Sequence, residues 1–154
     1  MKKIKAILLS AFTLLALVGL NTSADAQTIG YVNYKNVESN YEYAKAAYKE
    51  IDTKYLELRQ FLMDKEKQYK NIDSPINKKN FEEQVQKDFK AKSEAFDKLK
   101  LKKAQEVETN ILEATKAVAA DKKIDVVLDY RVIFTGGVDL SQDVINYLNS
   151  GKFK

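Results

Sequence analysis

Apolar residues recur with a helical period along most of the chain. Over residues 37–72 they are spaced by alternating steps of four and three, and only Lys65 among them is charged. This repeat is typical of the narrow seam of a coiled coil. It predicts one helix of about 35 residues, which rises about 50 Å and must project from a domain of this size. The seam residues are Val37, Tyr41, Ala44, Tyr48, Ile51, Tyr55, Leu58, Leu62, Lys65, Tyr69 and Ile72.

A second helical pattern follows the only proline of the chain. In "NIDSPINKKN", residues 71–80, Pro75 suits the first position of a new helix, and Asn80 with Glu83 offers a second start. A step of five between Leu99 and Ala104 breaks the repeat, which predicts that the two halves of this helix face different partners. The apolar positions are Val85, Phe89, Phe96, Leu99, Ala104, Val107, Ile111, Ala114 and Val118.

The two helical patterns predict an antiparallel hairpin. A short connection brings consecutive helices side by side, so residues 37–119 are expected to form one hairpin with its tip at 71–80. Many of its positions are charged, which leaves only a narrow seam to bury.

Segments rich in β-branched and aromatic residues lie at both ends of this hairpin. Residues 28–34, "TIGYVNY", predict a strand, and residues 124–137 predict two β-rich runs around a turn at 129–131, ended by two glycines. In "DLSQDVINYLN", Ser141 suits the N-cap of a short final helix. Because a hairpin brings its base ends together, residues 27–36 and 120–154 are expected to form one small β body. The predicted fold class is therefore α+β and mostly helical.

The first 26 residues have the three parts of a secretory signal peptide. A basic start with Lys2, Lys3 and Lys5 precedes an apolar run at 6–20, and "ADA" at 24–26 suits cleavage after Ala26. The run is shorter than the roughly 20 residues of a membrane span, which disfavours an uncleaved anchor. We therefore expect export, and a mature chain of residues 27–154 that forms a single domain.

Charge and composition exclude several function classes. The precursor carries a net charge of +4, but removal of Lys2, Lys3, Lys5 and Asp25 leaves 23 basic and 21 acidic side chains. A balance of +2 gives little support to nucleic-acid binding on the ground of charge. The absence of cysteine excludes a disulfide framework and a lipid-bearing cysteine.

Catalysis and metal binding have weak candidates. The chain has no histidine and no cysteine, so the commonest general base, transition-metal ligand and thiolate nucleophile are missing. The carboxylate pairs Glu82 with Glu83 and Asp125 with Asp129 remain, and we interpret both as solvated surface groups. We expect no catalytic residue, no metal and no cofactor.

The part of the hairpin around its tip has an excess of positive charge. Residues 65–103 hold 12 basic and 7 acidic side chains, a net charge of +5. This region suits anionic lipid headgroups, lipopolysaccharide phosphates or acidic polypeptides, or it is simply a solvated lysine-rich face. Tyr43, Leu56, Phe61 and Met63 fall off the seam and are potential contacts for other chains. The contact candidates for a bound polypeptide are Phe61, Met63, Phe81, Phe89, Phe96, Lys78, Lys79, Lys87 and Lys90.

The order of elements and the terminal sequences resemble a known family. "IGYVNYKNV", a long charged helical middle and "DKKIDVVLDYRVIFTGGVDLSQDVINYLN" are similar to the Skp (OmpH) periplasmic chaperones over essentially the whole mature chain. The resemblance implies a homotrimer in which strands of three chains form a small β-barrel, and three hairpins extend from it as tentacles. It implies ATP-independent holding of unfolded outer-membrane β-barrel proteins in the periplasm. The residues expected to pack the trimer body are Ile29, Tyr31, Val107, Ile111, Val118, Val126, Leu128 and Ile133.

A structural protein is the main alternative. An exported coiled-coil spacer or envelope tether without chaperone activity has the same helical pattern. It predicts a fully closed seam between the helices, no suppression of aggregation, and a single defined partner.

Overall fold

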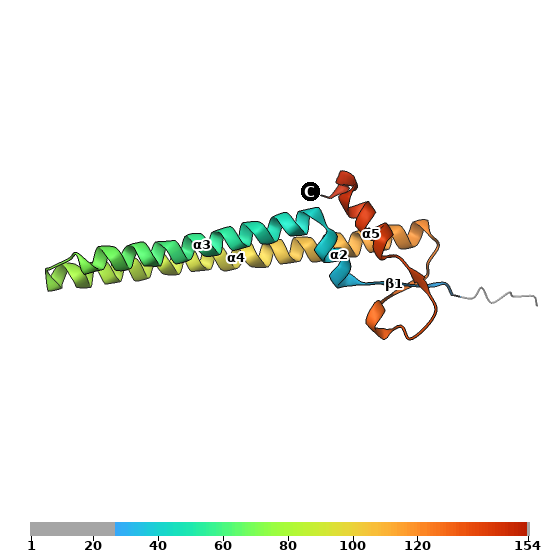
Figure 1. The fold of residues 1–154 in the computed structure, drawn as a ribbon, viewed down its shortest axis with the longest axis horizontal. Coiled ribbons are helices and arrows are strands. Elements are labelled where there is room, and N and C mark those ends of the chain that lie inside the picture. The colour runs from blue at the N-terminus through green and yellow to red at the C-terminus, as the bar shows by residue number, and fades with distance from the viewer. Residues whose placement is uncertain (1–26, 154) are drawn as a thin grey trace, which may run out of the picture.

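A computed structural model describes residues 27–153, and the predicted signal peptide lies outside them. Figure 1 shows a long helical hairpin that projects from a small body of short strands and helices. In chain order the elements are β1 (Ile29–Val32), α2 (Tyr34–Asn40), α3 (Glu42–Lys70), α4 (Pro75–Asp121), β2 (Val126–Asp129), the 3₁₀ turn η1 (Tyr130–Val132), β3 (Val138–Asp139), α5 (Ser141–Tyr147) and the π-helical turn η2 (Leu148–Lys152).

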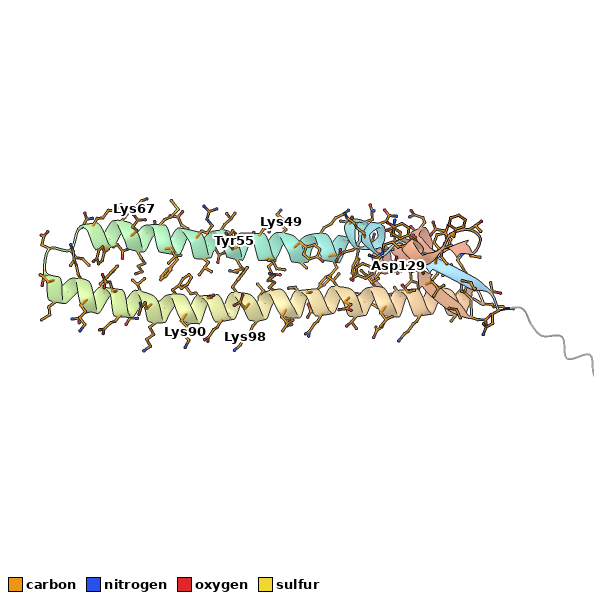
Figure 2. The ribbon with its side chains drawn as sticks, turned by 90° about the horizontal axis from the view of Figure 1, so that it is seen from below. Lys49, Tyr55, Lys67, Lys90, Lys98 and Asp129 are labelled. Atoms are coloured by element: carbon orange, nitrogen blue, oxygen red, sulfur yellow. The ribbon has the colours of Figure 1, made fainter. Side chains whose placement is uncertain are left out.

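The hairpin consists of α3 and α4, which run antiparallel and side by side (Figures 1 and 2). Residues 71–74 connect them, and α4 begins at Pro75, which confirms the helix start predicted from the proline. The alternative start at Asn80 is not used. The amides of Asn71 and Ile72 donate to the carbonyls of Gln68 and Tyr69, which satisfies orphan acceptors at the end of α3.

The predicted continuous helix from Val37 is wrong at one point, because the chain breaks between α2 and α3 at Tyr41. Tyr41 has extended backbone angles, φ −83° and ψ 116°, and its side chain is buried. The side chain of Asn149 accepts the amide of Glu42 at 3.0 Å and donates to the carbonyl of Asn40 at 2.9 Å. It therefore satisfies backbone groups on both sides of the break, and Asn110 donates to the Tyr41 hydroxyl at 3.0 Å.

The body contains a three-stranded parallel sheet with the strand order β2-β1-β3. The pairing of β1 with β2 confirms that segments from the two ends of the chain meet. β1 ends at Val32, two residues before the predicted end, because the Asn33 side chain accepts the amide of Asn36 and begins α2.

The second β-rich run was predicted wrongly. The Asp129 side chain accepts the amide of Arg131 at 2.9 Å and begins the turn η1, so Ile133 and Phe134 lie outside any strand. The third strand instead follows the glycines: Gly136 and Gly137 have φ values of +80° and +86° and reverse the chain before β3.

The core joins α5 and η2 to the sheet and to the base of the hairpin. Leu140 is fully buried, and a Cβ on Gly30 would lie only 2.9 Å from its Cδ1 atom, so the sheet and α5 approach closely at this glycine. Ser141 is the first residue of α5 and not the predicted N-cap. Its amide donates to the Asp139 carboxylate, and its Oγ accepts the amide of Asn33 at 2.9 Å.

We call the buried base of the hairpin the neck, namely Ala44 and Ala47 of α3 with residues 107–119 of α4. Ala44, Ala47 and Ala114 are all buried, and their small side chains let the two helices approach each other. The larger side chains of Val107, Ile111 and Val118 complete this core. The neck thereby fixes the hairpin to the body.

Candidate functional site

Beyond the neck, residues 48–106 form what we call the open arm. None of them is buried, although α3 and α4 lie side by side along this whole length. The buried residues of the described chain are Gly30, Val32, Val37, Tyr41, Ala44, Ala47, Val107, Ile111, Ala114, Val118, Ala119, Leu140, Ser141, Val144, Ile145 and Leu148. The apolar side chains of the open arm are therefore all at least partly accessible to other molecules.

The contact line between the helices differs from the predicted seam. Ala47 is only 2% exposed, whereas the predicted seam residue Tyr48 is 39% exposed. Phe61, which we placed off the seam, is half-buried, with the ammonium groups of Lys65 and Lys92 at 5.5 and 5.2 Å from its ring centre. One row of the predicted seam is nevertheless on the contact line, because Ala44, Ile51, Leu58, Lys65 and Ile72 are buried or half-buried. The second row is shifted from Tyr48, Tyr55 and Leu62, which are exposed, to Ala47 and Phe61.

Tyr43 is a second residue that the predicted seam misplaced. It is half-buried against the core, and its hydroxyl donates to the carboxylate of Glu106. This hydrogen bond is the main cause of a raised pKa of the Tyr43 phenol. Lys103 reaches across from α4, with its ammonium group 5.4 Å from the Tyr43 ring and 3.0 Å from Glu50. Polar contacts between α3 and α4 thus mark the end of the neck that adjoins the rest of the hairpin.

Aromatic pairs and lysines line the contact between the helices farther out. Tyr55 faces Phe96 with ring centres 6.2 Å apart, and Figure 2 shows Tyr55 between the two helices. Near the tip, Tyr69 faces Phe81 at 6.4 Å, and Lys78 lies 5.2 Å from the Tyr69 ring. Ammonium groups over aromatic faces are attractive contacts that also stay hydrated. Positive charge therefore sits beside apolar surface inside the seam as well as on the outer faces.

Three open grooves follow the arm. One near the tip has a volume of about 350 Å³ and one midway along has about 340 Å³, both between α3 and α4, while a third of about 490 Å³ lies on α3 alone. Each combines apolar surface with charged rims. Their lining includes Leu62, Tyr69, Phe81 and Val85 at the tip, Leu58, Phe96, Leu99 and Lys92 midway, and Leu56, Met63, Arg59 and Gln60 on α3.

The predicted contact residues occupy two environments. Phe81, Phe89, Phe96 and Lys78 are half-buried, whereas Met63, Lys79, Lys87 and Lys90 are exposed. Figure 2 shows Lys90 on the outer side of α4 and Lys67 on the outer side of α3. The two most exposed large apolar residues of the open arm, Ile76 at the tip and Leu101 on α4, were not among the predicted contacts. Both lie off the heptad among lysines, in "INKKN" and "LKLKK", and this pattern was the available signal.

The residues predicted to pack the trimer body also separate into two groups. Val107, Ile111 and Val118 are buried in the core of their own chain. Ile29 and Leu128 are exposed, and Tyr31, Val126 and Ile133 are half-buried. Only the second group is therefore accessible to another chain.

The candidate carboxylates have local structural partners. Asp125 accepts the amide of Thr28 at 2.8 Å, and Asp129 binds the Arg131 guanidinium at 2.8 and 3.0 Å, which lowers the pKa of the Asp129 carboxyl. Glu82 lies beside Tyr69, and their hydrogen bond raises the pKa of the Tyr69 phenol. Within residues 27–153 no group of acidic side chains is arranged to hold a metal ion. Asp125, Asp129 and Glu82 thus contribute to turns and helix contacts.

None of the helices within residues 27–153 combines the length and the apolar character needed to cross a bilayer. Residues 28–148 match the family model described as "Outer membrane protein (OmpH-like)". No curated protein matches the chain.

Proposed function

The chain belongs to the OmpH-like family, and on that premise we propose that it is a periplasmic chaperone that holds unfolded outer-membrane β-barrel proteins and prevents their aggregation without ATP. The observation that carries this proposal is the open arm, in which no residue between 48 and 106 is buried. A long helical surface with half-exposed apolar side chains offers many contacts to an extended polypeptide.

Such contacts are individually weak, which suits a holdase. A half-buried phenylalanine has already lost part of its contact with water in the free protein. A bound chain can therefore gain hydrophobic free energy only from the area that is still exposed. Several grooves along one arm bind different segments of the same unfolded chain, and the combined affinity exceeds that of any single groove. Release then needs no nucleotide, because each contact opens and closes independently.

We propose that three chains assemble through the sheet. β2 and β3 are the two edges of the sheet and have no further strand partner among residues 27–153. Unpaired edges readily accept another strand. When the β2 edge of one chain meets the β3 edge of the next, the contact is heterologous and a rotation closes it into a ring.

The accessible body residues are assigned to this assembly. In the proposed ring Ile29, Tyr31, Val126, Leu128 and Ile133 lie between chains, while Val107, Ile111 and Val118 support them from within each chain. Three arms that start from one ring enclose a shared space. An unfolded chain in that space contacts all three arms at once, which raises the effective concentration of binding grooves.

The lysines near the tip extend the proposal to anionic partners. Lys79, Lys87 and Lys90 are exposed, and Lys78 is placed over Tyr69. They attract acidic segments of a client, and the same charges suit anionic lipid or lipopolysaccharide phosphates.

The structure favours this function over a passive spacer. A spacer or tether gains rigidity from a closed seam, and the open arm has no buried residue along its length. Lysines placed between the helices, such as Lys65 and Lys92 on Phe61, further keep the seam hydrated.

Light scattering during dilution of a urea-denatured outer-membrane β-barrel protein tests the proposal. The triple variant Leu56→Gln, Met63→Gln and Leu101→Gln should need about tenfold more protein for half-maximal protection, because three apolar contacts are lost. All three side chains are exposed, so native mass and helical content should not change.

The matched control replaces three exposed polar residues of the same helices, Asp64→Gln, Lys102→Gln and Thr109→Gln, without a change in net charge. It should protect as well as the unmodified protein. Full protection by the apolar triple variant would contradict the proposal, as would an absence of protection by the unmodified protein.

A further inference from the structure

The loop before β3 carries the most exposed aromatic residue of the described chain. The Phe134 side chain is 102% exposed and Val132 is 70% exposed, so neither contacts the rest of its own chain appreciably. In Figure 1 this loop, drawn in orange, lies on the side of β1 opposite α5. Single exposed apolar residues are common, but a phenylalanine and a valine presented together at a loop end mark a contact surface.

The shape of this loop is fixed by its own contacts. Arg131 is held to the Asp129 carboxylate through two hydrogen bonds, and Gly136 and Gly137 adopt positive φ values that other residues avoid. A Cβ on Gly137 would lie 3.3 Å from the Tyr31 ring, so this end of the loop lies close to β1. A loop held in this way loses little conformational entropy when it binds.

The same body has an apolar groove of suitable size. The groove has a volume of about 240 Å³ and lies between α4 and the β1–β2 edge of the sheet. An apolar cavity of roughly 150 Å³ is sufficient to take up benzene. Leu112 is 53% exposed on its wall, so the groove is not covered by its own chain. The apolar lining consists of Val32, Ile111, Leu112, Val127 and Leu128, with Tyr34, Glu108 and Asp129 at the rim.

Pairing of the β3 edge of one chain with the β2 edge of another brings the Phe134 side chain close to the groove. Leu128, which lines the groove, belongs to the β2 edge, and Phe134 precedes the first residue of the β3 edge, Val138, by four residues. Four residues span at most about 14 Å, so a β3 strand placed beside the β2 strand of a neighbour holds Phe134 within reach of the neighbour's groove.

We propose that Phe134 of each chain inserts into the groove formed by Leu112, Val127 and Leu128 of a second copy of this chain. The inference rests on the proposed self-assembly and names the contact that locks it. The loop with Phe134 and the groove are different parts of one chain, so the contact is heterologous and repeats around a closed ring of chains. Val132 covers the rim of the groove beside the inserted Phe134 side chain.

Native mass spectrometry and sedimentation over a dilution series test the contact. Phe134→Ala should raise the concentration at which the assembly dissociates by about tenfold or more, because each interface loses a buried aromatic side chain. The control Ile76→Ala removes another exposed apolar side chain, at the tip, and should leave the dissociation midpoint unchanged. Since Phe134 is fully exposed within its own chain, the variant should retain its helical content.

Cross-linking locates the contact directly, because the chain contains no cysteine. Phe134→Cys in one preparation and Leu112→Cys in a differently tagged one are mixed, allowed to exchange, and oxidised. Covalent pairs that carry both tags are expected. The matched pair Ile76→Cys with Leu112→Cys should give none.

The outcomes separate this inference from the proposed function. An assembly of unchanged mass and dissociation midpoint in Phe134→Ala, without cross-links to Leu112→Cys, would overturn the inserted phenylalanine and leave the chaperone proposal intact. A protein that is monomeric at every concentration would overturn both the contact and the proposed ring. Protection of a client by that monomer would still support chaperone activity.

Discussion

The neck and the open arm are formed by the same two helices, yet they pack differently. In the neck, Ala44, Ala47 and Ala114 are buried and the helices share a dry core. In the open arm, aromatic rings and lysines occupy the contact line, and no side chain is buried. The size and charge of the side chains on the contact line thus decide whether they are buried between the two helices.

The two regions also differ in charge. Residues 65–103 have a net charge of +5, whereas the remaining parts of the hairpin helices, 42–64 and 104–121, hold 5 basic and 9 acidic side chains, a net charge of −4. The positive end lies at the tip, far from the body. Although the net charge of the whole chain is small, positive and negative charges are strongly separated along the hairpin. This separation directs acidic partners to the tip.

Matched substitutions in the two regions should have very different costs. Ile111→Ala in the neck is expected to lower the free energy of unfolding by about 2–5 kcal/mol, because it leaves a cavity in a buried site. Leu62→Ala in the open arm should cost less than about 1 kcal/mol, since that residue is already 41% exposed in the folded chain. Urea unfolding at one protein concentration, followed by circular dichroism, measures both. Equal costs would show that the open arm is a closed coiled coil in solution.

Charge removal near the tip should slow capture of a client more than it weakens the complex. The variant with Lys78, Lys79, Lys87 and Lys90 changed to glutamine should capture an acidic unfolded chain several-fold more slowly at low salt. Screening at about 0.5 M salt should remove most of the difference. Stopped-flow fluorescence of a labelled client measures the rate. The control changes four lysines closer to the body, Lys35, Lys45, Lys49 and Lys116, and an equal slowing by it would contradict a role for the tip.

Local signals in the sequence were sufficient for much of the fold. Pro75 marked the start of α4, and the apolar repeat marked two helices that form a hairpin. The small apolar residues Ala114 and Val118 lay on the predicted face and are buried in the neck. These features depend on residues within one or two helical turns of each other, so they can be predicted from the periodic pattern of the sequence.

Features that depend on distant residues were not predictable. The break at Tyr41 is held by Asn149, more than a hundred residues away, and nothing near Tyr41 indicates it. The β-branched residues before the glycines suggested a strand, but Asp129 turns the chain there and Phe134 faces solvent. The sequence also did not show that the seam stays open, because periodicity gives the direction of a side chain and not the distance between helices.

The boundary between the neck and the open arm offers the smallest and most local test. Tyr48 is the first residue of the open arm, and its hydroxyl donates to Glu38 of α2, so it links α3 to α2 beside the break at Tyr41. Burial raises the pKa of the Tyr48 phenol above its ordinary value of 10.0, and the hydrogen bond to the Glu38 carboxylate raises it further. The neutral phenol is therefore favoured in the folded chain.

Because the folded-state pKa is above the unfolded one, the contribution of Tyr48 to stability is complete below about pH 10 and is lost as the pH rises through the folded-state pKa. Stability measured by urea unfolding should fall above pH 10, and Tyr48→Phe should make that fall shallower. Glu38→Gln keeps a hydrogen-bond acceptor but removes the charge, so it should restore part of the ordinary titration of Tyr48. If stability falls above pH 10 just as steeply in Tyr48→Phe as in the unmodified protein, α2 and α3 are not linked through this phenol. The hydrogen bond from Tyr48 to Glu38 would then not stabilise the boundary between the neck and the open arm.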